Sequence, residues 1–501
     1  MRRRDFIIST ALGLTAAQAP TVLAAGVRFS RNPFTLGVAS GDVTQDSVVL
    51  WTRLAPEPLA VDGGVGQAAI PVQWELFQDK DMQRLIRRGE ELAVPELAHS
   101  VHVDVQGLEP GREYWYRFFA GTHVSAAGRT KTLPAAGSQP ESIRIVSASC
   151  QNYTHGYFVA YEHIIADNPD FVIHLGDYIY DTSYGVTFRR HDSEQEPATL
   201  TDFRRRHALY KTDEQLQRAH ARLPFFTTLD NHDAVIDTDP AGLAKRAAAY
   251  QAWYEHMPLR DYNRNRFQLK RTIRVGELLQ LSLLDTRQYR ANQFLCPASE
   301  PAYGYGNYRI RCPDMFAVER SMLGQAQERW LTENILNNKA RWNVIASSSV
   351  FLPFNLHIDG EVFNYIGSWD AYPANRDRVV AAIDRAKTGH AMILSGDLHS
   401  FWAIDGAYYT PATPAVEFVT SSISANWPEP MAKPVSDNLD HNPQVKFYEP
   451  DKRGYLLHEV TAREWQTTAR AVHDVRDARS KVFDLARFVV ENGKSGIKRV
   501  Y

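Results

Sequence analysis

The sequence predicts an α/β protein in which a small N-terminal β-sandwich precedes a larger domain of buried strands and helices. Between residues 27 and 135, short strands with alternating apolar and polar residues are separated by turns that contain Gly or Pro. Beyond Pro140 the strands become uniformly apolar and alternate with helical stretches, which is typical of a sheet covered by helices on both faces. Residues 133–140 join the two parts and have the composition of a linker.

Composition excludes several other classes of protein. The 501 residues contain 56 Lys and Arg against 58 Asp and Glu, a formal net charge of −2. A dedicated nucleic-acid binder usually carries a clustered basic excess, so no nucleic-acid-binding patch is expected. Hydrophobic residues make up 44% and charged residues 23%, values that are close to the globular average and exclude disorder, collagen and coiled coil.

Residues 1–25 predict an export signal. Arg3 and Arg4 precede Phe6 and a stretch of small apolar residues that is too short and too polar to remain as a membrane span. The run from Arg3 resembles the twin-arginine signal, by which bacteria export folded proteins, and residues 22–24 offer a cleavage site. The alternative is a basic N-terminus on a buried helix. We therefore expect a periplasmic or secreted protein, not an integral membrane protein, with the twin-arginine translocon as its export partner.

The N-terminal domain, residues 27–135, is expected to contain strands at residues 47–51, 72–77, 101–105 and 114–119. Leu108-Glu109-Pro110-Gly111 followed by Tyr114 resembles the corner of a fibronectin type III or immunoglobulin-like domain. In such a corner a tyrosine hydroxyl holds the turn.

The larger domain, residues 141–501, has buried strands and candidate helices in alternation. Strands are expected at residues 143–146, 171–175, 225–229, 279–284, 344–346 and 392–394, and helices at 241–256 and 325–337. Open α/β sheets place their ligands at the carboxyl ends of the strands. Four of these strands are followed by turns rich in metal-ligand residues, namely 149–150, 176–181, 230–233 and 395–399. One such turn could be only a helix cap, but four at one sheet edge predict a metal site.

The motifs carry a resemblance to a known family. Gly-Asp-x-x-Tyr at 176–180, Asn231-His232 and Gly-x-x-His at 396–399 resemble the calcineurin-like metallophosphoesterase superfamily and its purple acid phosphatase branch. Together with Leu-Asp-Thr-Arg at 284–287 and Ser-Trp-Asp-x-Tyr-Pro at 368–373, the set resembles the PhoD-type alkaline phosphatases over essentially the whole chain. The resemblance implies a four-layer αββα catalytic domain and a metal-dependent phosphoric ester hydrolase.

The resemblance also implies a centre of trivalent iron, Fe(3+), and calcium, Ca(2+). Its ligands would be Cys150, Asp177, Tyr180, Asn231, Asp397 and His399. A thiolate and a phenolate suit trivalent iron, and the oxygens of Asn231 and Asp397 suit calcium. The alternative for Tyr180 and His399 is that they are ordinary core residues.

One motif departs from the PhoD pattern. The family has Trp-Asp-Asp-His-Glu where this chain has Leu229-Asp230-Asn231-His232-Asp233, so one negative charge is missing and the number of calcium ions is open. A third ion could use Asp181, Asp230 or Asp233, each of which could equally be a cap or turn residue.

His232 and Asn231 are the candidate catalytic residues. The resemblance implies that His232 contacts the phosphoryl oxygen or protonates the leaving group. Further candidates for phosphate contact are Arg287, His357 and Arg376, although a helix-surface salt bridge is the more common role for any one arginine. Asp370 and Tyr372 could line or support the pocket.

The expected function is alkaline phosphatase or phosphodiesterase activity through metal-activated water, on phosphate mono- or diesters, in a monomer. Two alternatives remain: a phospholipase D-like phosphodiesterase, or a wall- or carbohydrate-binding protein with a structural metal site. Cys296 and Cys312 flank a loop that a disulfide would stabilise in an oxidising compartment. Cys150 is then unpaired, and is either inert or functional.

Overall fold

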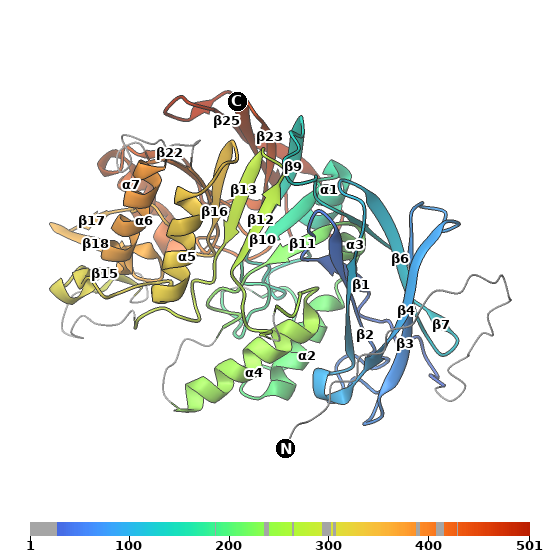
Figure 1. Cartoon of the computed structure of the whole chain (residues 1–501). Coiled ribbons are helices and arrows are strands. Elements are labelled where there is room, and N and C mark those ends of the chain that lie inside the picture. Colours follow the sequence, from blue (N-terminus) through green and yellow to red (C-terminus); the bar gives the residue numbers. More distant parts are fainter. Residues whose placement is uncertain are drawn as a thin grey trace, which may run out of the picture.

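The computed structural model describes residues 28–185, 187–234, 240–262, 265–292, 302–303, 307–386, 391–406, 415–427 and 429–501. The predicted export signal and Cys296 lie outside these residues. The fold is a mixed α/β fold built on two large sheets (Figure 1).

The first sheet has ten strands, which come from the N-terminal, middle and C-terminal parts of the chain. In spatial order they are β26 (Lys498–Arg499), β25 (Val482–Glu491), β24 (Glu464–Val472), β23 (Arg453–Thr461), β9 (Ser142–Ala148), β10 (Phe171–His174), β11 (Pro224–Thr227), β1 (Val38–Gly41), β2 (Ser47–Arg53) and β5 (Ser100–Gln106). Strands β9, β10, β11 and β1 are parallel, and antiparallel pairs extend the sheet on both sides.

The second sheet has seven strands: β12 (Arg271–Val275), β13 (Leu279–Leu283), β16 (Trp342–Ala346), β19 (Ala391–Ser395), β21 (Ala415–Val419), β20 (Phe401–Asp405) and β22 (Val445–Glu449). Its central strands β13, β16, β19 and β21 are parallel. A small sheet beside it contains β14 (Ala302–Tyr303), β15 (Tyr308–Ile310), β18 (Glu361–Tyr365) and β17 (Leu356–Ile358).

Seven helices are described outside the masked stretches: α1 (Ala160–Asp167), α2 (Leu200–Lys211), α3 (Glu214–Arg222), α4 (Pro240–His256), α5 (Gly324–Leu336), α6 (Pro373–Arg385) and α7 (Glu429–Asp437). Helices α1 to α4 pack with β9, β10 and β11 in one core, and α5 and α6 pack with β16 and β19 in another. A third core contains apolar residues of both large sheets. In the part of the chain that is described, no helix is long and apolar enough to cross a membrane.

The N-terminal strands divide between two sheets. β4 (Leu85–Ala93), β3 (Ile70–Phe77), β6 (Glu113–Ala120), β7 (His123–Val124) and β8 (Gly128–Lys131) form a separate five-stranded sheet. Strands β1, β2 and β5 instead continue the ten-stranded sheet, because Ser40 pairs with Pro224 of β11. The backbone on the two sides of residues 133–140 is thus hydrogen-bonded together, and the proposed division into two domains stays a prediction.

Several expected elements are present with small shifts of their ends. The predicted N-terminal strands correspond to β2, β3, β5 and β6, and the predicted helices to α4 and α5. The hydroxyl of Tyr114 accepts a hydrogen bond from the Glu109 amide at 2.9 Å, the contact expected of a tyrosine corner.

Candidate metal centre

Four turns bring the predicted ligands together. Cys150 follows β9, Asp177 follows β10, and residues 230–233 follow β11, so three of the turns leave neighbouring parallel strands at one edge. The fourth turn follows β19 of the second sheet and carries Asp397 and His399. The site therefore lies where the carboxyl ends of both sheets meet.

Four of the six predicted ligand residues share an uncommon backbone conformation. Cys150, Asp177, Asp397 and His399 have positive φ angles of 58°, 52°, 69° and 49°. Non-glycine residues adopt this region rarely, and such strained positions concentrate at functional sites. Gly176, at φ 100°, permits the turn before Asp177, because a Cβ there would lie 2.5 Å from the Asp230 Cβ.

Three donor atoms converge closely enough to hold one ion. Single ligand atoms of Cys150, Asp177 and His399, all buried, lie within 4.8 Å of one another. The Tyr180 hydroxyl joins them, 3.2 Å from Asp177 Oδ2 and 2.9 Å from His399 Nε2. Thiolate, carboxylate, phenolate and imidazole together form a donor set that fits trivalent iron.

The hydrogen bonds orient His399 for this role. Its Nδ1 donates to the Asn426 carbonyl at 2.9 Å, which leaves Nε2 directed at Tyr180 and the other donors. A metal-ligating histidine commonly has its second nitrogen fixed in this way.

A second group of oxygens lies beside the first. A pocket of about 180 Å³ is lined by Asp177, Asn231, His232, Asp397 and His399, with Tyr184, Tyr308, Tyr365 and Trp427 in its walls. Asp397 accepts hydrogen bonds from Ser349 Oγ at 3.3 Å and from the Tyr365 hydroxyl at 3.2 Å. Its oxygens and the side-chain oxygen of Asn231 are the hard ligands that calcium prefers.

Two acidic groups of the site have pKa values that are shifted toward their neutral forms. Burial, and then the neighbouring Asp230, raise the pKa of Asp397 well above its ordinary value. Burial also raises the pKa of the Cys150 thiol, and Asp177 adds to the effect. Since buried like charges disfavour ionisation, a bound cation would stabilise the deprotonated groups.

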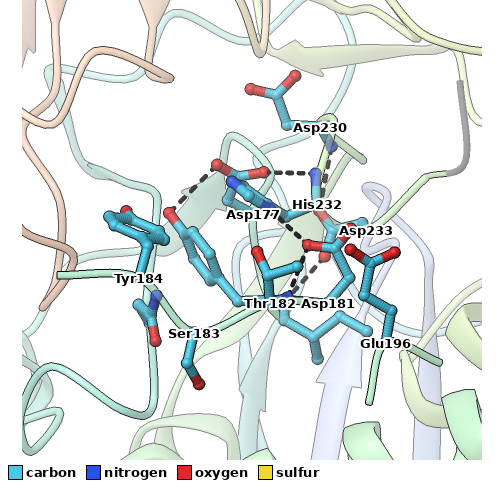
Figure 2. A network of polar contacts seen from close by, with 12 residues as sticks. Asp177, Asp181, Thr182, Ser183, Tyr184, Glu196, Asp230, His232 and Asp233 are labelled. Carbon is cyan, nitrogen blue, oxygen red and sulfur yellow. Dashed lines mark hydrogen bonds and ion pairs between the residues drawn. The ribbon is translucent and has the colours of Figure 1, made fainter. Parts of the chain in front are cut away.

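His232 lies between two carboxylates. Its backbone amide donates to Asp177 Oδ1 at 3.1 Å, and its Nδ1 lies 2.6 Å from Asp181 Oδ1 (Figure 2). Burial alone would lower the pKa of His232, but Asp177 and Asp181 outweigh burial and raise the pKa to about 9. The ring also packs on Tyr180, with centroids 4.2 Å apart.

Asp230 and Asp233 have partners within the protein. The carboxylate of Asp233 accepts hydrogen bonds from the amides of Ile179 and Asp230, at 2.9 and 3.0 Å, as a turn residue would. Asp230 forms a buried ion pair with Arg287, yet its Oδ2 has no hydrogen-bond partner among the described residues. Arg287 also lies 3.9 Å from Asp397, so it supports the carboxylates from the interior.

The two remaining phosphate candidates lie away from this pocket. Arg376 is buried and pairs with Asp370 at 2.6 Å, and His357 stacks on His441 with centroids 4.5 Å apart. Neither lines the 180 Å³ pocket. The Tyr372 hydroxyl donates to the Ala291 carbonyl at 2.5 Å, which indicates a structural contact.

Sequence reasoning missed several residues of the site. Ser349 and Tyr365 hold Asp397, and Tyr184 and Trp427 line both the small pocket and an adjoining one of about 1040 Å³. A serine run at 347–349 directly after β16 was a usable signal. No local pattern marks Tyr365, because it comes from the separate small sheet.

Cys150 is a free thiol, and Cys312 is disulfide-bonded. The pairing of Cys312 with Cys296 stays a prediction, since Cys296 is not among the described residues.

Comparisons with family models, with known sequences and with solved structures agree on one family. The family model described as PhoD-like phosphatase matches residues 145–469, and the model of the N-terminal domain of PhoD-like phosphatases matches residues 17–134. The chain is 39% identical to alkaline phosphatase D of Bacillus subtilis (strain 168) over 520 aligned residues, which cover 99% of this chain and 87% of that protein. A solved structure of PhoD superposes with a TM-score of 0.87 at 38% identity, covering 95% of this chain and 93% of the other.

Proposed function

The chain belongs to the PhoD-like phosphatase family and is a phosphoesterase, and from this premise we propose that it is an exported alkaline phosphatase and phosphodiesterase with an Fe(3+)–Ca(2+) centre. One observation supports the proposal above others. The cluster of Cys150, Asp177, Tyr180 and His399 adjoins a pocket that Asn231, His232 and Asp397 line.

In the proposed centre, Cys150, Asp177, Tyr180 and His399 would hold the iron, and Asp177, Asn231 and Asp397 would hold calcium. When bound, the ions supply Lewis-acid activation of the ester and of water. A purely structural site would be closed by protein ligands, whereas the pocket beside these donors leaves room for a phosphate group.

The chain's own residues perform the proton transfer and the orientation. Asp181 fixes Nδ1 of His232, so the other ring nitrogen is available to the pocket. We assign to His232 the protonation of the leaving group, because Asp177 and Asp181 favour its charged form. Arg287 contributes positive charge from behind Asp230 and Asp397.

The finer architecture belongs to the same proposal. It comprises a signal peptide at residues 1–25, a β-sandwich at 27–135 and a four-layer αββα catalytic domain at 141–501. The core that contains apolar residues of both large sheets supports the layered catalytic domain. Export by the twin-arginine translocon to the periplasm or beyond, and a monomeric state, complete the proposal.

Metal analysis combined with two chromogenic substrates tests the function. We expect iron and calcium in the purified protein, and hydrolysis of both p-nitrophenyl phosphate and bis-p-nitrophenyl phosphate. A calcium-selective chelator should abolish activity, and calcium should restore it better than zinc. Full activity after exhaustive calcium removal would exclude calcium, and hydrolysis of neither ester would refute the proposed function.

A further inference from the structure

The loop at residues 422–427 connects two of the proposed iron ligands. Its Ala425 amide donates to the Cys150 carbonyl at 3.2 Å, and its Asn426 carbonyl accepts from Nδ1 of His399 at 2.9 Å. The position of this short loop therefore affects the backbone of one ligand and the ring of another.

A second histidine, His155, holds the same loop. Its Nδ1 accepts a hydrogen bond from the Asn426 amide at 3.0 Å, and its Nε2 lies 2.7 Å from the Tyr184 carbonyl. Since a carbonyl only accepts, the proton of His155 must be on Nε2, and the ring is the neutral tautomer that can accept at Nδ1. His155 is 2% exposed and packs edge-on against the Tyr184 ring, with centroids 4.6 Å apart.

These contacts form one continuous chain of hydrogen bonds. It runs from the Tyr184 carbonyl through the His155 ring to the backbone of Asn426, and from there to the His399 ring. The Asn426 side chain is exposed, so it is the backbone of this residue that the two imidazoles contact. Arg453 fixes the neighbouring part of the loop by donating to the carbonyls of Ala425 and His399.

We propose that His155 is a positioning residue for the metal centre, which holds Asn426 so that its carbonyl keeps Nε2 of His399 directed at Cys150 and Asp177. This inference rests on the proposed function, because it takes His399 as a metal ligand. Partners in the outer shell of a metal site typically change metal affinity or activity 10- to 100-fold when they are replaced. The same range is expected here.

The test uses the purified full chain loaded with metal. His155→Phe removes both hydrogen bonds and keeps an aromatic ring, and it should release iron to a chelator about 10- to 100-fold faster than the wild type. His155→Gln keeps one hydrogen-bond donor and one acceptor, so it should release iron more slowly than His155→Phe. The matched control is His163→Phe. His163 lies on α1, away from the site, and its Nε2 donates to the Ser480 carbonyl at 2.8 Å. That variant should retain iron as the wild type does.

Thermal unfolding of the metal-free variants separates positioning from folding. Faster iron loss with an unchanged unfolding midpoint supports the inference. The inference is overturned if His155→Phe retains iron as the wild type does, or if His163→Phe loses iron equally fast. It is also overturned if His155→Phe loses iron only to the extent that its unfolding midpoint is lowered. If the wild type hydrolyses esters and His155→Phe keeps its iron, only this inference is refuted. If the purified wild type contains no metal, the proposed centre is refuted as well.

Discussion

At the scale of single residues, Cys150 has the surroundings that the proposed metal centre requires. Its side chain is fully buried, it donates to Asp177 Oδ2 at 3.7 Å, and burial raises its pKa. A thiol in such surroundings is inert as a nucleophile but becomes a strong ligand once a metal displaces its proton.

Cys150→Ala should therefore lose iron and any visible colour. Activity should fall by at least about 100-fold, because outer-shell changes alone cost 10- to 100-fold and a lost ligand costs more. The fold should persist, since alanine is smaller and apolar, and circular dichroism checks this. Cys150→Ser, which keeps a ligand atom, should lose less. Unchanged iron stoichiometry and turnover in Cys150→Ala would contradict the assignment.

That the candidate ligands come together could be predicted from the sequence, because they lie in the turns that follow strands. Two of the residues that hold them could not be predicted. Tyr365 and Asn426 reach Asp397 and His399 from other elements, and only the packing of these elements brings them there. Arg287 was a candidate for phosphate contact, yet its charge is directed at two buried carboxylates.

At the scale of elements, the turn after β10 determines where Asp177 lies. Gly176→Ala should destabilise the protein by roughly 2 kcal/mol or more, because it combines a positive φ with a Cβ placed 2.5 Å from Asp230. Iron content should fall with it. Chemical denaturation and metal analysis measure both effects.

The control for that prediction is Gly360→Ala. Gly360 has a φ of +85°, but a Cβ there would meet nothing within 4 Å. Gly360→Ala should lower the free energy of unfolding through backbone strain, without loss of metal. Equal metal content in the two variants would mean that the close approach of Gly176 to Asp230 does not matter to the site.

Some elements escaped prediction for physical reasons. Helix α2 buries Arg206, His207 and Lys211 together with apolar residues, so its buried side is mixed and the apolar helical period is obscured. Strand β1 is only four residues long, and its parallel partner β11 lies far along the chain. Strands β9 and β10, fully buried on both faces at their carboxyl ends, were the clear cases.

At the scale of the whole molecule, buried neutral histidines predict acid lability. Burial lowers the pKa of both His174 and His458 to about 3, and lowers that of His207, His220 and His256. Below a pH of about 6.5 these histidines bind protons in the unfolded chain but not in the folded protein, so their contribution to stability falls as pH falls. At pH 5, His174 and His458 together should contribute about 4 kcal/mol less than at pH 7, whereas Asp397 and Glu417, whose pKa values burial raises, act in the opposite direction. Denaturation at pH 7 and pH 5 measures the net difference.

His174→Phe tests the source of that effect. Neither ring nitrogen of His174 has a hydrogen-bond partner in the described part of the structure, so phenylalanine removes the titrating group without losing a hydrogen bond. The difference in stability between pH 7 and pH 5 should shrink by about 2 kcal/mol. An unchanged difference would show that His174 does not contribute.

Export is tested by replacing Arg3 and Arg4 with Lys. A centre with a thiolate ligand is best loaded where thiols stay reduced, and the twin-arginine route passes folded protein. We expect metal-loaded, active enzyme to accumulate in the cytoplasm with its N-terminal segment uncleaved. Mature active protein outside the inner membrane at the normal rate would contradict this route.

The ten-stranded sheet pairs strands that lie far apart in the sequence, and this affects folding during translation. Strand β1 leaves the ribosome roughly 180 residues before its partner β11, and β9 waits even longer for β23. The edge of β1 thus stays open until residues 224–227 emerge, and one edge of β9 stays open until residues 453–461 emerge. Unpaired strand edges are prone to wrong pairing. Only after residues 453–461 have emerged can β9 be paired on both sides. Nascent chains should therefore depend on chaperones until translation is nearly finished, and a stalled or truncated product should aggregate rather than form a smaller folded enzyme.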